Sequence, residues 1–261
     1  MSIIQAIILA IIEGITEFLP VSSTGHMILA SAMMKIQDEE FAKTFEIVIQ
    51  LGAILAVLFL YIKRFLAGIN IYLKLFVAFL PTGIIGLLAY KTIKHYLFNP
   101  YTVSVSLIAG GVVLILLDKW SEEKKSSYAK VEDISFSGAF KIGLIQCLSM
   151  IPGVSRAAAT IFGGIFSGLN RVQAAEFSFL LAIPTMVAAS GKDLWEAKET
   201  ITFENIQLLL IGSGISFLVA LIAIKAFVAF LTKYGFKHFG YYRIAIGVLF
   251  LWYAVFIGIA G

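Results

Sequence analysis

One stretch near the N-terminus decides the fold: Glu13-Gly14-Ile15-Thr16-Glu17-Phe18-Leu19-Pro20-Val21-Ser22-Ser23-Thr24-Gly25-His26. It sets two carboxylates, three consecutive hydroxyl side chains and an imidazole directly after an almost wholly aliphatic run, residues 3–12. A charged side chain in hydrocarbon costs about 2.5 to 3.5 kcal/mol by insertion scales, so such groups face a protein interior or a water-filled cavity. The stretch therefore predicts a functional site within an apolar chain.

The composition indicates that the surrounding medium is a lipid bilayer. Hydrophobic residues make up 60% of the chain and charged residues 14%, and the mean hydropathy is +0.95. A soluble domain has a different composition. The single cysteine, Cys147, excludes a disulfide within the chain. No basic residue precedes the first apolar run, so we expect it to be mature structure rather than a removable signal peptide. The lysines behind the net charge of +4 are scattered over loops, and nucleic-acid binding is not expected.

Hydropathy predicts an all-α polytopic membrane protein with six transmembrane helices, each long enough for about 30 Å of hydrocarbon. Two further apolar segments, residues 2–34 and 138–170, are each interrupted by proline, serine and glycine. A non-helical backbone at membrane depth is tolerated only where protein or water satisfies it. We therefore expect both segments to be re-entrant helix-loop-helix hairpins, with tips at residues 20–25 and 152–156. The six expected spans are residues 45–62, 71–90, 101–117, 173–190, 206–232 and 241–260.

The two interrupted segments resemble each other. Pro20-Val21-Ser22-Ser23 aligns with Pro152-Gly153-Val154-Ser155, and each is followed by a span that carries an acid, Glu46 or Glu176. Interrupted segments in corresponding halves are the usual sign of a midplane binding site between inverted repeats. We expect a single membrane domain over residues 1–261, which consists of repeat 1 over about 1–117, a cytoplasmic loop over 118–137 and repeat 2 over about 138–261.

The distribution of lysine and arginine predicts the orientation. Ten of these residues, Arg243 among them, fall in the loops at 63–74, 118–133 and 233–243. Six fall in the alternating loops at 35–44, 91–100 and 191–205. The positive-inside rule places the first set in the cytoplasm. The first hairpin then enters from the outer face and the second from the inner face, so the predicted repeats are inverted.

The acids of the first hairpin are spaced for a shared ligand. Glu13 and Glu17 are four residues apart, and a helix stacks them one turn apart on one face. Two such carboxylates are favourable together only around a divalent metal or a basic side chain, or with one carboxyl protonated. We interpret them as metal-binding residues. The alternative is a pair of acids at the water interface.

The two tips supply groups suited to a phosphate. Gly25 permits a sharp turn, and backbone amides at a helix N-terminus hold phosphate oxygens. His26 is three residues from Ser23 and is a candidate to take its proton. The alternative is a helix-capping serine and a histidine that satisfies a local carbonyl. Arg156, after the second interruption, carries a planar fork that matches phosphate. Its alternative role is a structural ion pair with an acid of the first hairpin.

Together with Pro152-Gly153-Val154-Ser155-Arg156, the first motif is similar to that of the undecaprenyl-diphosphate phosphatase (bacitracin-resistance) family of bacterial membrane proteins. The resemblance covers essentially the whole chain, including residues 43–56 and 176–184. It implies hydrolysis of undecaprenyl pyrophosphate to the monophosphate on the outer face of the bacterial inner membrane. That reaction recycles the lipid carrier of cell-wall synthesis and confers bacitracin resistance. The resemblance also implies six spans, two re-entrant hairpins and inverted repeats.

The family motifs also assign roles to residues of this chain. Because a diphosphate is negatively charged, we expect Glu13 and Glu17 to bind it through a divalent cation, Mg2+ or Ca2+. One departure is Ala157-Ala158, where the family commonly has Ser-Gly, so one hydroxyl is missing. The family motifs match Glu13, Glu17, Ser23, Thr24, His26 and Arg156. The expected catalytic residues are Glu13, Glu17, Ser23, His26 and Arg156, and the expected substrate-binding residues are Ser22, Thr24, Gly25, Gly153, Ser155 and Arg156.

The expected mechanism is phosphoanhydride cleavage in a cavity open to the outer leaflet, while the prenyl tail stays in lipid. Ser23 is the expected nucleophile and His26 its base; direct attack by His26 and attack by water remain alternatives. Many secondary transporters also consist of inverted repeats with broken helices. A lipid-phosphate flippase or an ion-coupled carrier is therefore the alternative function. The sequence leaves a homodimer open.

Overall fold

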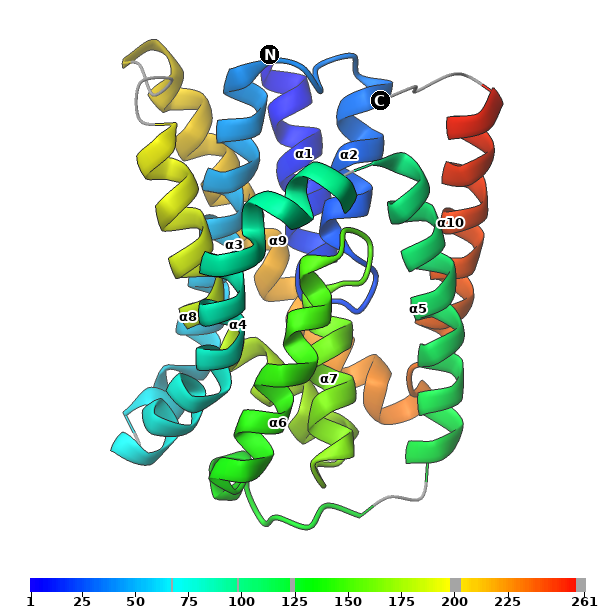
Figure 1. The fold of residues 1–261 in the computed structure, drawn as a ribbon. Helices are drawn as coiled ribbons and strands as arrows, with labels where there is room; N and C mark the ends of the chain where they lie inside the picture. The colour runs from blue at the N-terminus through cyan, green and yellow to red at the C-terminus, as the bar shows by residue number, and fades with distance from the viewer. Residues whose placement is uncertain (67, 98, 123–124, 198–202, 257–261) are drawn as a thin grey trace.

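The computed structural model describes the whole chain except residues 67, 98, 123–124, 198–202 and 257–261 (Figure 1). All regular secondary structure in the described part is helical. The first half contains α1 (Ile3–Thr16), α2 (Ser23–Met33), α3 (Glu40–Phe65), α4 (Ile69–Leu97) and α5 (Pro100–Ser121). The second half contains η1 (Val131–Asp133), α6 (Phe136–Gln146), η2 (Cys147–Met150), α7 (Arg156–Phe166), α8 (Arg171–Glu196), α9 (Phe203–Tyr234) and α10 (Lys237–Phe256).

The predicted all-α polytopic membrane fold is confirmed. Among the described residues, five helices are long and apolar enough to cross a membrane: α3, α4 over Ile69–Ala89, α5, α8 over Arg171–Trp195, and α9 over Asn205–Tyr234. The sixth predicted span, residues 241–260, corresponds to the 20-residue α10, whose N-terminal turns carry lysine, histidine and arginine. Residues 257–260 of that span lie outside the described part of the chain. α10 packs along α5 (Figure 1).

The first interrupted segment is a helical hairpin that opens at one end of the molecule. α1 has 14 residues, and at 1.5 Å per residue it extends about 21 Å, too short to cross about 30 Å of hydrocarbon. The start of α1 is joined to the end of α2 by a hydrogen bond from Gln5 Nε2 to the carbonyl of Met34 (3.3 Å). The terminal amine of Met1 also pairs with Glu39 (2.8 Å). The loop between the helices therefore lies inside the molecule.

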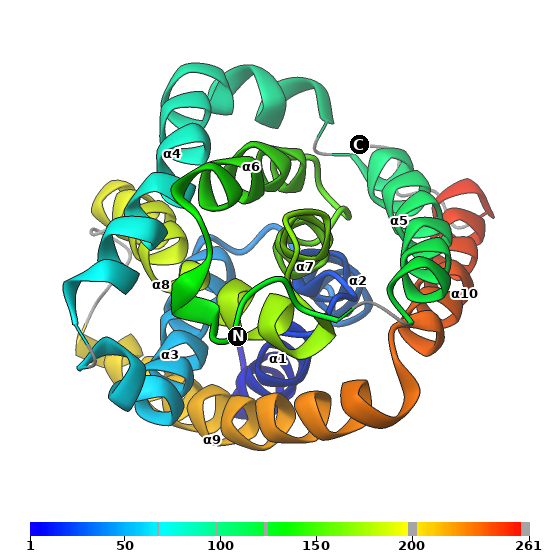
Figure 2. The same cartoon turned by 90° about the horizontal axis from the view of Figure 1, so that it is seen from below.

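The second interrupted segment forms a hairpin that opens at the opposite end (Figure 1). α6 and α7 have 11 residues each. Ser167, just after α7, donates to the carbonyl of Gly138 near the start of α6 (3.3 Å). The tip of this hairpin meets the tip of the first one in the middle of the fold, as the view from below also shows (Figure 2).

The long helices encircle the two hairpins (Figure 2). Each hairpin packs against a helix from the other half of the chain: α1 contacts α9, and α6 contacts α4. The two helices that end the halves, α5 and α10, pack on each other. This reciprocal packing shields both interrupted segments from lipid, where an exposed backbone would lack hydrogen-bond partners.

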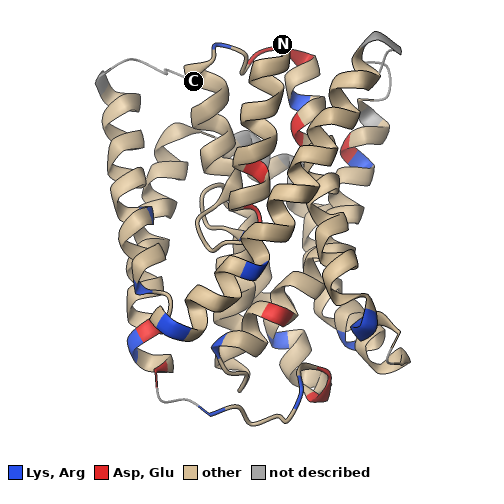
Figure 3. Ribbon diagram, turned by 180° about the vertical axis from the view of Figure 1, so that it is seen from behind, with Lys and Arg blue, Asp and Glu red and all other residues tan. Residues whose placement is uncertain are grey.

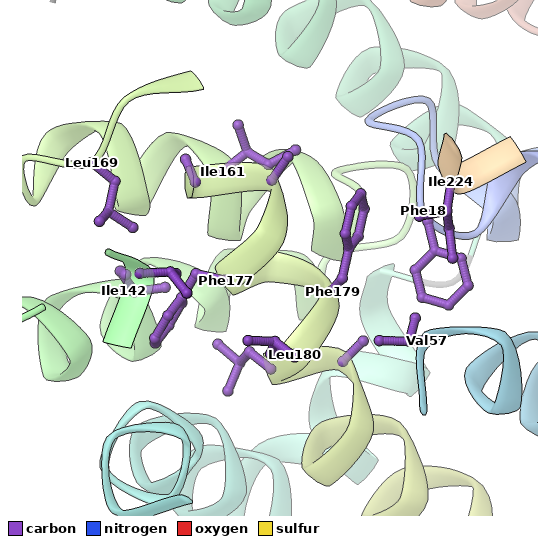
Figure 4. Packing of buried hydrophobic residues seen from close by; sticks show 14 of the residues in the cluster. Phe18, Val57, Ile142, Ile161, Leu169, Phe177, Phe179, Leu180 and Ile224 are labelled. Carbon is purple, nitrogen blue, oxygen red and sulfur yellow. The ribbon is translucent and has the colours of Figure 1, made fainter. Parts of the chain in front are cut away.

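A buried aromatic cluster joins the first hairpin to α8 (Figure 4). Phe18 and Phe179 are fully buried, and their rings meet edge to face with centroids 5.8 Å apart. Phe177 and Leu180 continue the cluster toward α6 and α7. Such aromatic pairs contribute about 0.5 to 1.5 kcal/mol beyond their area burial. The cluster fixes the turn after α1, which carries the functional side chains.

Lysine and arginine gather at the end where the α6–α7 hairpin opens (Figure 3). There Arg64 bridges Glu132 of η1 (2.7 Å) and Glu176 of α8 (2.8 Å). Several of the residues that the charge count assigned to loops lie in helices instead. Arg243 differs most from that assignment, because it lies inside α10 and is fully buried. Helix α10 begins at Lys237 and takes most of the predicted loop 233–243 into the bundle.

The positive-inside rule gives a topological test. On a Cys147→Ala background, Asp38→Cys should react with a membrane-impermeant thiol reagent in intact cells, and Lys125→Cys should react only after lysis, because the rule predicts that the basic end faces the cytoplasm. Both positions are exposed. A third test position, Glu199, lies outside the described residues. If Lys125→Cys were labelled in intact cells and Asp38→Cys were not, the orientation in the membrane would be the opposite of the predicted one.

Candidate active site

A cavity of about 220 Å³ lies between the two hairpin tips. Its lining carries carboxylate, hydroxyl, amide and guanidinium groups, in contrast to the apolar surroundings of the bundle. Four parts of the fold contribute to it: the tip of the α1–α2 hairpin, the tip of the α6–α7 hairpin, α3 and α8. Its lining residues are Glu17, Ser22, Ser23, Thr24, Gln50, Ser149, Met150, Pro152, Gly153, Ser155, Arg156, Thr185, Met186 and Ala189.

Two helix N-termini meet at this cavity, each capped by a serine in an unusual conformation. Ser22 precedes α2 with φ 70°, and its hydroxyl accepts from the amide of Gly25 (3.5 Å). Ser155 precedes α7 with φ 76°, and its hydroxyl accepts from the amide of Ala158 (3.2 Å). Positive φ is uncommon in residues with a side chain, and such strain concentrates at functional sites. Helix N-termini attract anions through free amides and the helix dipole, so the arrangement suits a phosphate group.

Three of the predicted catalytic side chains are in direct contact. Arg156 Nη2 donates to Glu17 Oε1 at 3.0 Å, and the hydroxyl of Ser23 donates to Glu17 Oε2 at 2.5 Å. The carboxylate of Glu17 therefore connects the two hairpins. This contact is the ion pair that the sequence left as an alternative role for Arg156, and it also holds the serine oxygen in a defined place.

One hydrogen-bond donor of Arg156 is unpaired, whereas the others have partners. Its Nη1 donates to the carbonyl of Ser178 (2.9 Å), and the guanidinium lies over the Phe18 ring at 5.6 Å. The Nε group is buried and has no hydrogen-bond partner. A buried unpaired donor costs about 1 to 3 kcal/mol. A phosphate oxygen that accepts from Nε would remove that cost.

Glu13 provides the complementary unpaired atom. It is 3% exposed, and its Oε1 has no hydrogen-bond partner. Glu46 of α3 is nearby in the same region and accepts from Ser31 (2.6 Å). In the part of the chain that the structure describes, no group of three or more His, Cys, Asp and Glu side chains gathers around one point. A cation bound here would take Glu13 and Glu17 as protein ligands and complete its shell with substrate oxygens or water, as Mg2+ does at phosphate sites.

His26 is turned away from Ser23. One ring nitrogen, Nδ1, is 2.8 Å from the carbonyl of Ser22, and the other, Nε2, is 2.7 Å from the hydroxyl of Tyr242 in α10. The two rings stack with an interplanar angle of 3°. Both nitrogens are therefore engaged, and the acceptor for the Ser23 proton is Glu17 instead. The histidine fixes the backbone of the loop through Ser22.

The cavity brings together most of the residues that the sequence selected: Glu17, Ser22, Ser23, Thr24, Gly153, Ser155 and Arg156 line it. Glu13, Gly25 and His26 are not among the lining residues. Gln50 and Thr185 were missed. The sequence does contain a signal for Gln50, because this residue is a lone amide in an apolar run. In the structure its side-chain oxygen accepts from Ser190 at 2.9 Å. Thr185 follows a proline within a helix and gave no such signal.

A second, apolar cavity of about 390 Å³ adjoins the polar one. It lies between α4 and α8, and Met150, Thr185 and Ala189 line both cavities. On the α4 side, small residues such as Gly83 and Gly86 make room for it. The polar site thus continues into a space suited to hydrocarbon.

The fold and site define a polytopic membrane protein with a pocket between two opposed hairpins, lined by hydroxyl, carboxylate and guanidinium groups. The chain belongs to the bacitracin resistance protein BacA family, whose model matches residues 6–249. It is similar to proteins named undecaprenyl-diphosphatase. The protein from Flavobacterium psychrophilum is 54% identical over 254 residues, which are 96% of this chain and 95% of the relative. Those from Bdellovibrio bacteriovorus (52% identical; 96% of this chain, 95% of the relative) and Wolinella succinogenes (51%; 97% and 98%) are similar over nearly their full lengths.

The unpaired oxygen of Glu13 predicts a measurable metal affinity. Glu13→Gln is nearly isosteric and should raise the dissociation constant for Mg2+ or Ca2+ by about tenfold or more, because it removes one charged ligand. Calorimetric titration of the purified protein with each ion provides the measurement. Glu46→Gln is the matched control, since Glu46 already accepts from Ser31. Equal affinities in wild type and Glu13→Gln would remove Glu13 from the metal site.

Proposed function

We propose that the protein hydrolyses undecaprenyl pyrophosphate to undecaprenyl phosphate and inorganic phosphate. The observation that carries this proposal is the contact of Ser23, Glu17 and Arg156 at a polar cavity that continues into an apolar one. A diphosphate joined to a hydrocarbon tail needs both environments. The names of the similar proteins agree with this substrate.

In the proposed reaction, the Ser23 oxygen attacks the terminal phosphorus. A bond forms between this oxygen and phosphorus as the bond from phosphorus to the bridging oxygen breaks, and its electron pair leaves with undecaprenyl phosphate. Glu17 Oε2 takes the serine proton, because it already accepts the hydroxyl at 2.5 Å. In the second step a bond forms between the oxygen of a water molecule and phosphorus as the bond from phosphorus to the Ser23 oxygen breaks. Glu17 returns its proton to the serine oxygen, and inorganic phosphate leaves with release of one water proton to solvent. Attack by water in the first step, and by His26 after a change of rotamer, are the alternatives.

The charges of the site match phosphoryl transfer. Negative charge spreads over the equatorial oxygens in the transition state, and its stabilisation is the main catalytic task. Arg156 and the amides at the N-termini of α2 and α7 would supply this stabilisation. Since the carboxylates repel a diphosphate, we propose that Glu13 and Glu17 bind it through Mg2+ or Ca2+. When bound, the ion would supply Lewis-acid polarisation of the phosphate.

The apolar cavity between α4 and α8 is the proposed site for the first isoprene units, and the rest of the tail would stay in lipid. We further propose that the protein lies in the bacterial inner membrane and that the site opens to the outer face. The basic end at the α6–α7 hairpin supports this orientation. The reciprocal packing of α1 on α9 and α6 on α4 supports an inverted repeat.

The hydroxyl contact favours hydrolysis over a carrier. A flippase or ion-coupled transporter would also use a cation and an arginine, but it does not need a serine oxygen held against a carboxylate. The similar proteins are named as diphosphatases.

Phosphate release by the purified protein tests the reaction. With a prenyl diphosphate and Mg2+, wild type should release inorganic phosphate, and Ser23→Ala should lose turnover by several orders of magnitude because it removes the nucleophile. Ser126→Ala, in the loop at the far end, should retain it. Tight binding of the diphosphate by wild type without any release would support the carrier instead.

Filling the apolar cavity tests the place of the tail. Gly86→Leu should raise KM for a C55 diphosphate by about tenfold, because its side chain would occupy the space of the first isoprene units. A Cβ at Gly86 meets only Met150 Cε, at 3.7 Å, so the fold should tolerate the change. Gly214→Leu in α9 is the control, since a Cβ there meets nothing within 4 Å. An unchanged KM in Gly86→Leu would place the tail elsewhere.

A further inference from the structure

Arg243 of α10 reaches into the centre of the molecule. Among the described residues it is the largest fully buried side chain, with 0% exposure. Removal of a cation from water costs several kcal/mol unless its donors are satisfied. A neutral side chain would fill the same space at lower cost, so the charge and the five donors of this residue call for an explanation.

All five donors of the guanidinium find backbone carbonyls. Nη1 donates to Pro20 (3.0 Å) and Val154 (2.9 Å). Nη2 donates to Gly153 (2.7 Å) and Ser106 (3.1 Å), and Nε donates to Leu107 (3.3 Å). Arginine has five N–H groups in a rigid fork, and each of them is used here.

The partners of Arg243 lie in both hairpin tips. Pro20 belongs to the loop that leads to Ser23, and Gly153 and Val154 come directly before Ser155 and Arg156. The other two partners belong to α5. One side chain thus connects the nucleophile loop, the arginine loop and a long helix that acts as a fixed reference.

Helix α5 is shaped to admit this side chain. A Cβ at Gly110 would lie 2.8 Å from Cζ of Arg243, and a Cβ at Gly111 would lie 3.2 Å from its Cβ. Gly110 therefore makes room for the guanidinium, whereas Gly111 lets α5 approach the backbone of α10, because a Cβ there would lie 2.7 Å from the carbonyl oxygen of Gly240. Gly110 and the buried arginine thus depend on each other sterically.

We propose that Arg243 is a positioning residue that sets the distance between the Ser23 loop and the Arg156 loop for phosphoryl transfer. The proposal rests on the proposed function. A displacement of about 1 Å between reacting groups costs about 100-fold in rate. Arg243 would act through the two loops, without touching the substrate.

The test compares kcat, KM and amide hydrogen exchange in wild type and Arg243→Lys. Lysine keeps the charge but cannot reach five carbonyls from one ammonium. We expect kcat to fall by about 100-fold with KM within about threefold. Exchange should rise selectively in residues 20–24 and 152–156, while α3 and α9 stay as in wild type. Arg171→Lys is the control, because Arg171 also donates to a backbone carbonyl, that of Asp118, but at the far end of α5. The kcat of this variant should equal that of wild type.

A second variant covers the case in which Arg243→Lys does not fold. Gly110→Ala keeps the arginine but displaces its guanidinium, and should give the same selective exchange and loss of kcat; Gly214→Ala, in open space, should not. Wild-type kcat in Gly110→Ala, or loss of kcat without increased exchange in the two loops, would overturn the proposal. If wild type released no phosphate, the proposed function would fail. Increased amide exchange in the two loops of the variants would still show that Arg243 positions these loops.

Discussion

A broken helix inside a bilayer leaves backbone carbonyls and amides that no water can satisfy, and the rest of this structure depends on how they are satisfied. Two hairpins meet tip to tip, so each covers the other. Serines at positive φ cap the returning helices, and Arg243 donates to carbonyls of both loops. The result is a polar chamber in an apolar bundle. The same features that make the interruption tolerable supply the amides and the charges for binding a phosphate.

The sequence predicted the parts of the fold that depend on local pattern. Apolar runs gave the long helices, and the interruptions at Pro20 and Pro152 gave the two hairpin tips. Helix α2 starts at Ser23, within the predicted tip at residues 20–25, because the Ser22 side chain caps it. The acids, the serine and Arg156 were recognisable because charges and hydroxyls are costly in an apolar chain.

Contacts between segments far apart in the sequence could not be predicted in the same way. Spacing suggested that His26 serves Ser23, yet the helix turns the imidazole toward Tyr242, more than two hundred residues away. Arg243 resembled an ordinary basic residue beside a loop, because its role depends on Gly110 of α5, which makes room for it. The apolar cavity, and the place of Thr185 in its lining, depend on the packing of α8 against α4 and the second hairpin tip.

The central claim is that residues from the two hairpins act as one catalytic unit. A double-mutant cycle on kcat tests it directly, with Glu17→Gln in the first hairpin, Arg156→Met in the second and both together, each measured by phosphate release. Side chains that share one function give strongly non-additive effects. The account predicts that either single change lowers kcat nearly as far as the double change. Independent losses that multiply in the double variant would contradict it.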